Sequence, residues 1–207
     1  IRSCLVGSEM CIRDRFQGLK DLRLRNWTEF PVDIESIDAV ILTHAHIDHS
    51  GYLPALFNKG YRGQVYTTEA TKDLCGILLP DAGYLQEEEA RYANKRGYSK
   101  HHPALSLFTE QDGRNCLELF QSFKQHEEFR IGDNLMIKFT PAGHILGSAC
   151  VQISDGQKTV VFSGDVGRPN DAIMRAPESI ESADYLVVES TYGLSLIHIS
   201  EPTRQDR

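Results

Sequence analysis

Four side chains that bind metal ions well lie within six residues, directly after an apolar run. The run is Ala39 to Leu42, and the cluster that follows reads His44-Ala45-His46-Ile47-Asp48-His49. Side chains two residues apart on an extended segment share a face, so His44 and His46 can bind one ion together. Asp48 and His49 follow where the chain turns and can point at a second ion. Nitrogen and carboxylate ligands suit Zn²⁺, and a site that thiolates do not close is usually catalytic.

The alternative for this cluster is a group of surface histidines beside a helix cap formed by Asp48. We disfavour it because clustered polar groups need partners, and none of the four side chains resembles packing material.

Two later segments offer further ligands at the ends of apolar strands. His144 lies in the small-residue turn 141–149, between the strand-like runs 135–139 and 150–153. Asp165 follows the apolar run 159–162 and is flanked by glycines. Alone, the first would be read as a solvated loop histidine and the second as an ordinary turn. Together with the first cluster they give three apolar strands that each end in a candidate ligand, which is the architecture of a metal site.

These segments resemble the metallo-β-lactamase superfamily, and more narrowly its β-CASP branch of nucleic-acid hydrolases. The His-x-His-x-Asp-His cluster marks the superfamily. The longer segments 41–51, 141–149 and 187–193 (Val-Val-Glu-Ser-Thr-Tyr-Gly) resemble RNA-processing β-CASP enzymes such as the polyadenylation endonuclease subunit and its prokaryotic relatives. The resemblance covers about residues 16–193. It implies an α/β (α+β) fold, the four-layer αββα sandwich, here truncated.

The resemblance also implies a role for each candidate residue. Two zinc ions are expected, the first held by three histidines and the second by an aspartate and a histidine, with one aspartate as a bridge: His44, His46 and His144; Asp48 and His49; Asp165. Asp48 and Glu189 are the candidate catalytic residues, and Glu189 matches the acidic residue where the β-CASP domain is inserted. A hydroxide shared by two such ions attacks phosphorus. The leaving-group acid is expected to be a histidine beyond Gly193, which Glu189 would orient.

The expected function of the parent protein is zinc-dependent hydrolysis of phosphodiester bonds in single-stranded RNA. Two alternatives stay open. A small-molecule hydrolase of thioesters, lactones or lactams would share the ligands but has no need of the Glu-Ser-Thr-Tyr-Gly segment. A non-catalytic β-CASP scaffold subunit usually loses ligands, whereas all six are intact here. The sequence does not distinguish RNA from DNA as the substrate, or endonucleolytic from exonucleolytic cleavage. It is compatible with a homodimer.

The two ends of the chain read as translations of a transposon-derived sequencing adapter. Leu194 to Arg204 matches one strand of that oligonucleotide, and Leu5 to Asp14 matches the opposite strand in another frame. We therefore expect residues 1–15 and 194–207 to be adapter-derived and exclude them from fold reasoning. Residues 16–193 are then a partial metallo-β-lactamase domain that lacks its first strands and the β-CASP domain. Such a fragment is expected to be inactive and to have open strand edges.

Composition restricts the partners and the compartment. The net charge of −7 is unlike the basic footprint of most nucleic-acid binders, although a metal pair would add local positive charge. Cys75, Cys116 and Cys150 follow no pairing pattern, which predicts reduced thiols in a cytoplasmic protein. No apolar run of about 18 residues occurs, so no membrane partner is expected.

Hydrophobic patterns predict the remaining elements. Strands are expected near 39–43, 64–67, 135–140, 149–154, 159–163 and 185–189, and helices near 51–58, 68–79 and 109–120, the last with a capping start at Thr109. The stretch 82–102 contains three tyrosines and mixed charges. A solvated helix is the favoured interpretation of this stretch, over a flap that contacts substrate.

Overall fold

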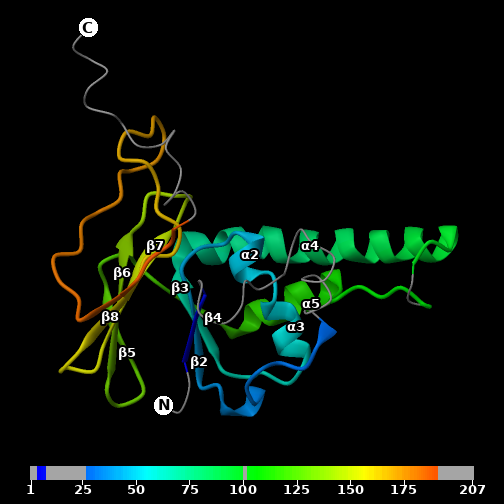
Figure 1. Ribbon diagram of the computed structural model, residues 1–207, viewed down its shortest axis with the longest axis horizontal. Helices are drawn as coiled ribbons and strands as arrows, with labels where there is room; N and C mark the ends of the chain where they lie inside the picture. Colours follow the sequence, from blue (N-terminus) through cyan, green and yellow to red (C-terminus); the bar gives the residue numbers. More distant parts are fainter. Residues whose placement is uncertain (1–3, 8–26, 100–101, 191–207) are drawn as a thin grey trace, which may run out of the picture.

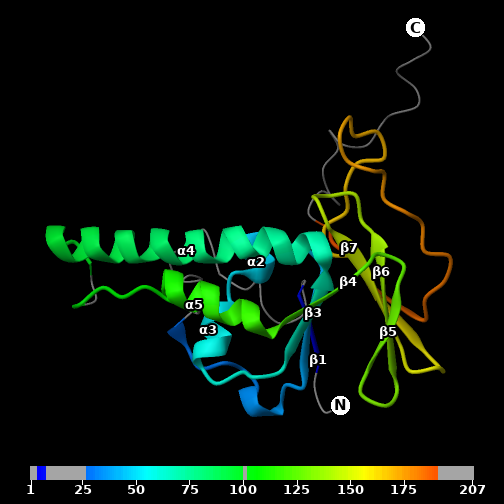
Figure 2. The same cartoon turned by 180° about the vertical axis from the view of Figure 1, so that it is seen from behind.

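Two β-sheets pack face to face, and all the described helices lie on the outer side of the first sheet (Figures 1 and 2). The computed structural model describes residues 4–7, 27–99 and 102–190. In this part of the chain three layers of the expected αββα sandwich are present, in the order helix, sheet, sheet. The α/β fold class predicted from the sequence is confirmed.

The first sheet is parallel and has the strand order β1-β2-β3-β4. Its strands are β1 (Cys4–Gly7), β2 (Ala39–Leu42), β3 (Gln64–Thr68) and β4 (Phe120–Phe123). Four helices follow its strands: α2 (Ile47–Ser50), α3 (Leu53–Asn58), α4 (Glu69–Arg96) and α5 (Glu110–Asn115). Two short 3₁₀ turns, η2 (Ile34–Ser36) and η3 (Cys116–Leu119), complete this half.

The second sheet has the order β5-β6-β7-β8-β9 and is antiparallel up to β8, while β9 runs parallel to β8. Its strands are β5 (Glu128–Ile131), β6 (Leu135–Pro141), β7 (Ala149–Ser154), β8 (Thr159–Phe162) and β9 (Tyr185–Val187).

Strand β2 belongs to both hydrophobic cores. Val40 and Leu42 pack into the core between the first sheet and the helices, whereas Ala39 and Ile41 pack into the core between the two sheets. A strand buried on both faces reads as a continuous apolar run, which explains why this run is unbroken by polar residues. The strand that leads to the histidine cluster is therefore the best anchored in the first sheet.

β1 lies within residues 1–15, the segment that the sequence predicts to be adapter-derived. Its backbone pairs in parallel with β2, with Cys4 opposite Ala39 and Gly7 opposite Leu42. The edge of β2 that we expected to be open is thus occupied. An unpaired edge offers a row of backbone N–H and C=O groups to any extended segment, so the exposed edge itself favours this pairing. The predictions for residues 8–15 and 194–207 concern segments outside the described residues.

Helix α4 is much longer than the predicted 68–79. It passes through Pro80, which has no amide to donate, and the carbonyl freed is that of Gly76 on the exposed face of the helix. The helix continues because α5 packs against it. Residues 82–96 belong to this helix, so the interpretation of 82–102 as a helix is confirmed over residues 82–96, while Lys100 and His101 lie outside the described residues.

Three other elements differ from the sequence prediction. The predicted helix 109–120 is divided into α5 and η3, and its capping start is confirmed by the Thr109–Asp112 capping box. The strands β4 and β5 were not predicted. Both are only four residues long, and their alternation is too short to stand out from loop sequence. No helix in the described ranges is long and apolar enough to cross a membrane.

Close backbone contact between α4 and α5 requires glycine, which gives a stability prediction. A Cβ on Gly83 would lie 2.6 Å from the amide nitrogen of Glu110 and would collide with the Thr109 carbonyl. Gly76, on the same helix, has nothing within 4 Å of its Cβ position. We expect Gly83→Ala to lower the free energy of unfolding by about 1–3 kcal/mol through overpacking. Gly76→Ala should raise it by about 0.5–1 kcal/mol through helix propensity. Urea unfolding of the two variants checks this, and equal effects would contradict the packing argument.

Candidate metal centre

The candidate ligands come from the ends of strands in both sheets. His44 and His46 follow β2, His144 lies in the β6–β7 connection, and Asp165 follows β8. The amide of Ala149, at the start of β7, donates to the carbonyl of Thr43 at 2.9 Å, so the two sheets are hydrogen-bonded to each other at this point. The convergence of strand ends predicted from the sequence is therefore present.

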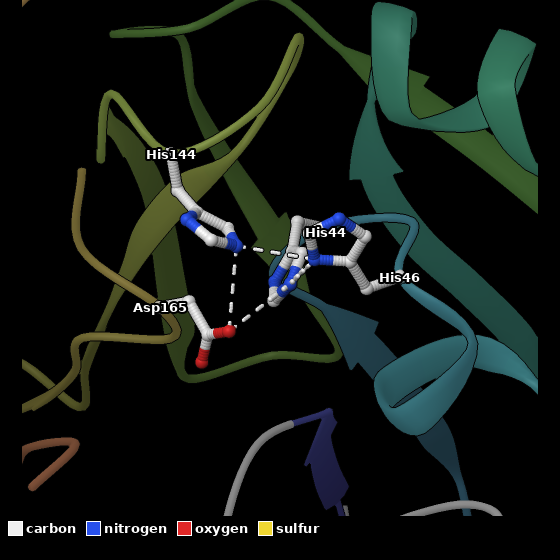
Figure 3. A group of neighbouring side chains, drawn as sticks. All are labelled: His44, His46, His144 and Asp165. Carbon is white, nitrogen blue, oxygen red and sulfur yellow. Dashed lines mark hydrogen bonds and ion pairs between the residues drawn. The ribbon is translucent and has the colours of Figure 1, made fainter. Parts of the chain in front are cut away.

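Four of the predicted ligands form one compact group (Figure 3). The Nδ1 atom of His46 lies 3.1 Å from the Nε2 atoms of both His44 and His144. The Oδ2 atom of Asp165 lies 3.7 Å from His44 Nε2 and 3.4 Å from His144 Nε2. All four ligand atoms lie within 4.8 Å of one another.

This spacing fits a small tetrahedral ion. Ligand atoms held 2.0–2.1 Å from one ion at tetrahedral angles are about 3.4 Å apart. Four of the six separations in this group are 3.1–3.7 Å, and the other two are no longer than 4.8 Å. Three ring nitrogens and a carboxylate oxygen also form a donor set typical of Zn²⁺. The chemistry and the spacing of the group therefore fit a metal ion.

The other oxygen of Asp165 faces a second pair of candidate ligands. Its Oδ1 atom lies 3.4 Å from Nε2 of His49, and the same nitrogen lies 3.5 Å from Oδ2 of Asp48. Both residues belong to the single turn of α2, which begins directly after His46. The two oxygens of Asp165 are thus divided between two groups of side chains, the arrangement that a bridging carboxylate requires.

Burial keeps the histidines in the form that binds metal. His44 is fully buried, and this desolvation, followed by the charge of His49, lowers its pKa from 6.5 to about 3. Burial also lowers the pKa of His46. The hydrogen bond from His49 is the main cause that lowers the pKa of Asp165 to about 2. At neutral pH His44 and His46 are therefore neutral imidazoles, and Asp165 is an ionised carboxylate.

Contacts with Thr43 and Ser148 orient two of these ligands. Thr43 Oγ1 lies 3.2 Å from Nδ1 of His44, which leaves Nε2 directed into the group. The buried Ser148 hydroxyl accepts the amides of His144 at 2.9 Å and of Ile145 at 3.2 Å, which fixes the loop that carries His144. Sequence reasoning did not identify Ser148, because a serine in a Gly-Ser turn gives no signal of its partners.

The same loop rests on the start of α4. Gly147 has φ of 79°, and a Cβ there would lie 2.5 Å from the amide nitrogen of Thr71. Its carbonyl accepts a hydrogen bond from Thr68 Oγ1 at 2.7 Å. Only glycine satisfies both the backbone angle and the close approach. The long helix therefore begins beside the metal ligands.

Glu189 lies beside the loop of Asp165 rather than within the ligand group. Its carboxylate accepts the amide of Val166 at 2.6 Å, and its own amide donates to Ser163 Oγ at 3.0 Å. Both contacts bracket Asp165 and hold its loop. The expected role of Glu189 in orienting a later histidine stays a prediction.

A family model described as a beta-lactamase superfamily domain matches residues 11–199. The chain belongs to this superfamily. The metallo-β-lactamase resemblance proposed from the motifs is thereby confirmed, and the described residues include a His/Asp group that could hold a metal ion.

Three relatives are similar in sequence to most of this metallo-β-lactamase chain. It is 36% identical to ribonuclease TTHA0252 of Thermus thermophilus over 91% of its own length and 40% of that protein. It is 34% identical to Integrator complex subunit 11 of Danio rerio over 78% of its length and 25% of that protein. It is also 34% identical to the transcription termination factor FttA of Methanococcus maripaludis over 77% of its own length and 24% of that protein. The chain spans less than half of the length of these relatives. They agree with the β-CASP resemblance.

The role of Ser148 can be tested by stability. Ser148→Ala leaves two partly buried amides of the His144 loop without the acceptor that Ser148 provides, so we expect the free energy of unfolding to fall by about 1–3 kcal/mol. Ser154→Ala, at the last residue of β7, alters a hydroxyl that accepts the exposed amide of Gly156 at 3.2 Å and should change the free energy of unfolding by less than about 0.5 kcal/mol. Denaturant unfolding of both variants is the measurement. A Ser148→Ala protein as stable as the Ser154→Ala protein would show that the loop does not depend on this hydroxyl.

Proposed function

We propose that this domain holds two zinc ions and belongs to a hydrolase that cleaves phosphodiester bonds in single-stranded RNA. The observation that carries the proposal is the divided carboxylate of Asp165, which faces three histidines through one oxygen and the His49–Asp48 pair through the other. The first ion would be held by His44, His46 and His144, and the second by Asp48 and His49, with Asp165 shared.

Bound zinc would supply a Lewis acid for a phosphate oxygen and would lower the pKa of water near neutrality. The chain supplies the rest. His44 and His46 keep their positions because β2, which they follow, packs into both hydrophobic cores, so little reorganisation is needed during reaction. Asp48, with half of its side chain exposed, lies on the open side of the group and can accept a proton from a water molecule there.

Glu189 is proposed as the second catalytic candidate, acting on the loop of Asp165. Its contact with the Val166 amide is charge-assisted and adjacent to the bridging residue. A shift of this loop would change the separation of the two ligand groups.

RNA is favoured as substrate by the relatives that are named a ribonuclease and an RNase J-like protein, and by the Glu-Ser-Thr-Tyr-Gly segment. A cytoplasmic location is proposed from the cysteines, since Cys75, Cys116 and Cys150 are free and buried. The homodimer stays a prediction.

The zinc assignment predicts a measurable metal content. The chain should retain up to two zinc ions, and His44→Ala combined with His46→Ala should remove the zinc of the first group. His126→Ala is a matched control, because His126 is an exposed histidine that is not part of the ligand group and pairs with Glu178 at 3.4 Å. Elemental analysis of the purified proteins after dialysis measures the difference. Equal zinc in the double variant and the control would refute the ligand assignment.

The substrate assignment predicts selectivity in the longer protein that carries this domain. That protein should cleave single-stranded RNA and should hydrolyse a β-lactam or a glutathione thioester at least about a hundredfold less efficiently, because polar groups of the site would be left unmatched. Parallel kcat/KM measurements on the three substrates provide the test. Turnover of the lactam or the thioester without cleavage of RNA would support the small-molecule hydrolase instead.

A further inference from the structure

The far end of α4 carries a cationic and aromatic surface that the proposed metal centre does not use. Between residues 91 and 109 the sequence contains Arg91, Lys95, Arg96 and Lys100 but neither Asp nor Glu, in a chain with a net charge of −7. Two tyrosines, Tyr92 and Tyr98, are interspersed with these cations. Positive charge alternating with aromatic rings is typical of surfaces that bind single-stranded nucleic acid.

The aromatic side chains are exposed and held together. Tyr92 is 54% exposed and Tyr98 is 60% exposed, and their ring centroids are 6.1 Å apart. The guanidinium of Arg96 lies 5.4 Å from the centre of the Tyr92 ring. We call Tyr92, Lys95, Arg96 and Tyr98 the α4 tip. It presents ring faces and positive charge on the same exposed turn.

The backbone of the α4 tip is well fixed. Gly97 ends the helix with φ of 68° and reverses the chain, which brings Tyr98 back toward Tyr92. The side chain of Asn94 makes two hydrogen bonds to the backbone of Ala104, at 2.9 and 2.7 Å, and ties the returning segment to the helix. A surface that is already ordered loses little conformational entropy on binding.

Helix electrostatics explain only part of this composition. Cations in the last turn interact favourably with the helix dipole, which accounts for Lys95 and Arg96. Arg91 is paired with Glu88 at 2.6 Å, so its charge is partly neutralised. Neither effect accounts for two exposed tyrosine rings that contact each other beside an arginine.

We propose that the α4 tip binds single-stranded RNA at a distance from the metal centre. The proposal rests on RNA being the substrate. α4 begins beside the loop of His144 and projects beyond the sheets (Figures 1 and 2). Its 28 residues span about 42 Å at 1.5 Å per residue. A stacked strand would need about twelve nucleotides, at 3.4 Å each, to reach from the tip to the ligands.

Binding of a labelled oligouridylate to the full chain in the presence of a chelator isolates the α4 tip from metal chemistry. Tyr92→Ala with Tyr98→Ala should weaken binding at least about fivefold through lost stacking, with an unchanged salt dependence. Lys95→Gln with Arg96→Gln should reduce the slope of log K against log salt by about 1.4, or 0.7 per lost phosphate contact.

Matched controls separate local from general effects. Tyr84→Ala removes a 48%-exposed tyrosine from the same helix outside the α4 tip, and Arg130→Gln removes an exposed arginine from β5. Both should bind the oligouridylate as the unaltered chain does.

Unchanged binding by both α4-tip variants, or no binding by the unaltered chain, would overturn the proposal. Such a result would leave the zinc measurement intact, so failure of the α4 tip and failure of the metal centre are distinguishable. Altered oligomeric state in the α4-tip variants, with unchanged RNA affinity, would assign the surface to protein association and would also overturn the proposal.

Discussion

The carboxylate of Asp165 is the point on which both halves of the molecule converge. It follows β8 of the second sheet, yet its oxygens face His44 and His49, which follow β2 of the first sheet. The approach is possible because Gly164, with φ of 56°, lies against Thr43, where a Cβ would be 2.9 Å from that of the threonine. Any other residue would separate the ends of the two strands. The close contact between the two sheets therefore also determines the geometry of the candidate metal centre.

The buried polar groups at this junction are satisfied mainly by the backbone of the opposite element. Thr67 Oγ1 donates to the carbonyl of Leu42, and the amide of Ala149 donates to that of Thr43. Burial without partners would cost free energy, so these bonds restrict how the strand ends can be arranged. β2 is also packed into a hydrophobic core on each of its two faces. The position of His44, just after this strand, is therefore fixed. The cores supply the rigidity that the ligands need.

The ligand residues could be predicted from sequence because each carries a local signal. His44 and His46 stand two apart after a buried strand, and His144 and Asp165 each follow an apolar run beside glycine. What could not be predicted depends on contacts between distant segments. The passage of α4 through Pro80 depends on its packing against α5, and the bond between Glu189 and the Val166 amide joins residues 23 apart. The pairing of β1 with β2 likewise depends on an available edge, not on a strong strand pattern.

The acidic balance of the chain illustrates why net charge is a weak guide to partners. Charges interact over about 8–10 Å at ordinary ionic strength, while α4 alone is several times longer than that. The acidic run 87–89 ends six residues, about 9 Å along the helix axis, before Lys95, and beyond Arg91 no acidic residue occurs before Glu110. A polyanion near the end of the helix therefore experiences mainly Lys95 and Arg96. At the candidate metal centre the local field is also separate from the net charge, because the neutral imidazoles of His44 and His46 lie beside the ionised, partly exposed Asp165. The proposed attraction of a phosphodiester to this domain would thus depend on two local fields at opposite ends of one helix, and each can be strong while the chain as a whole is negative.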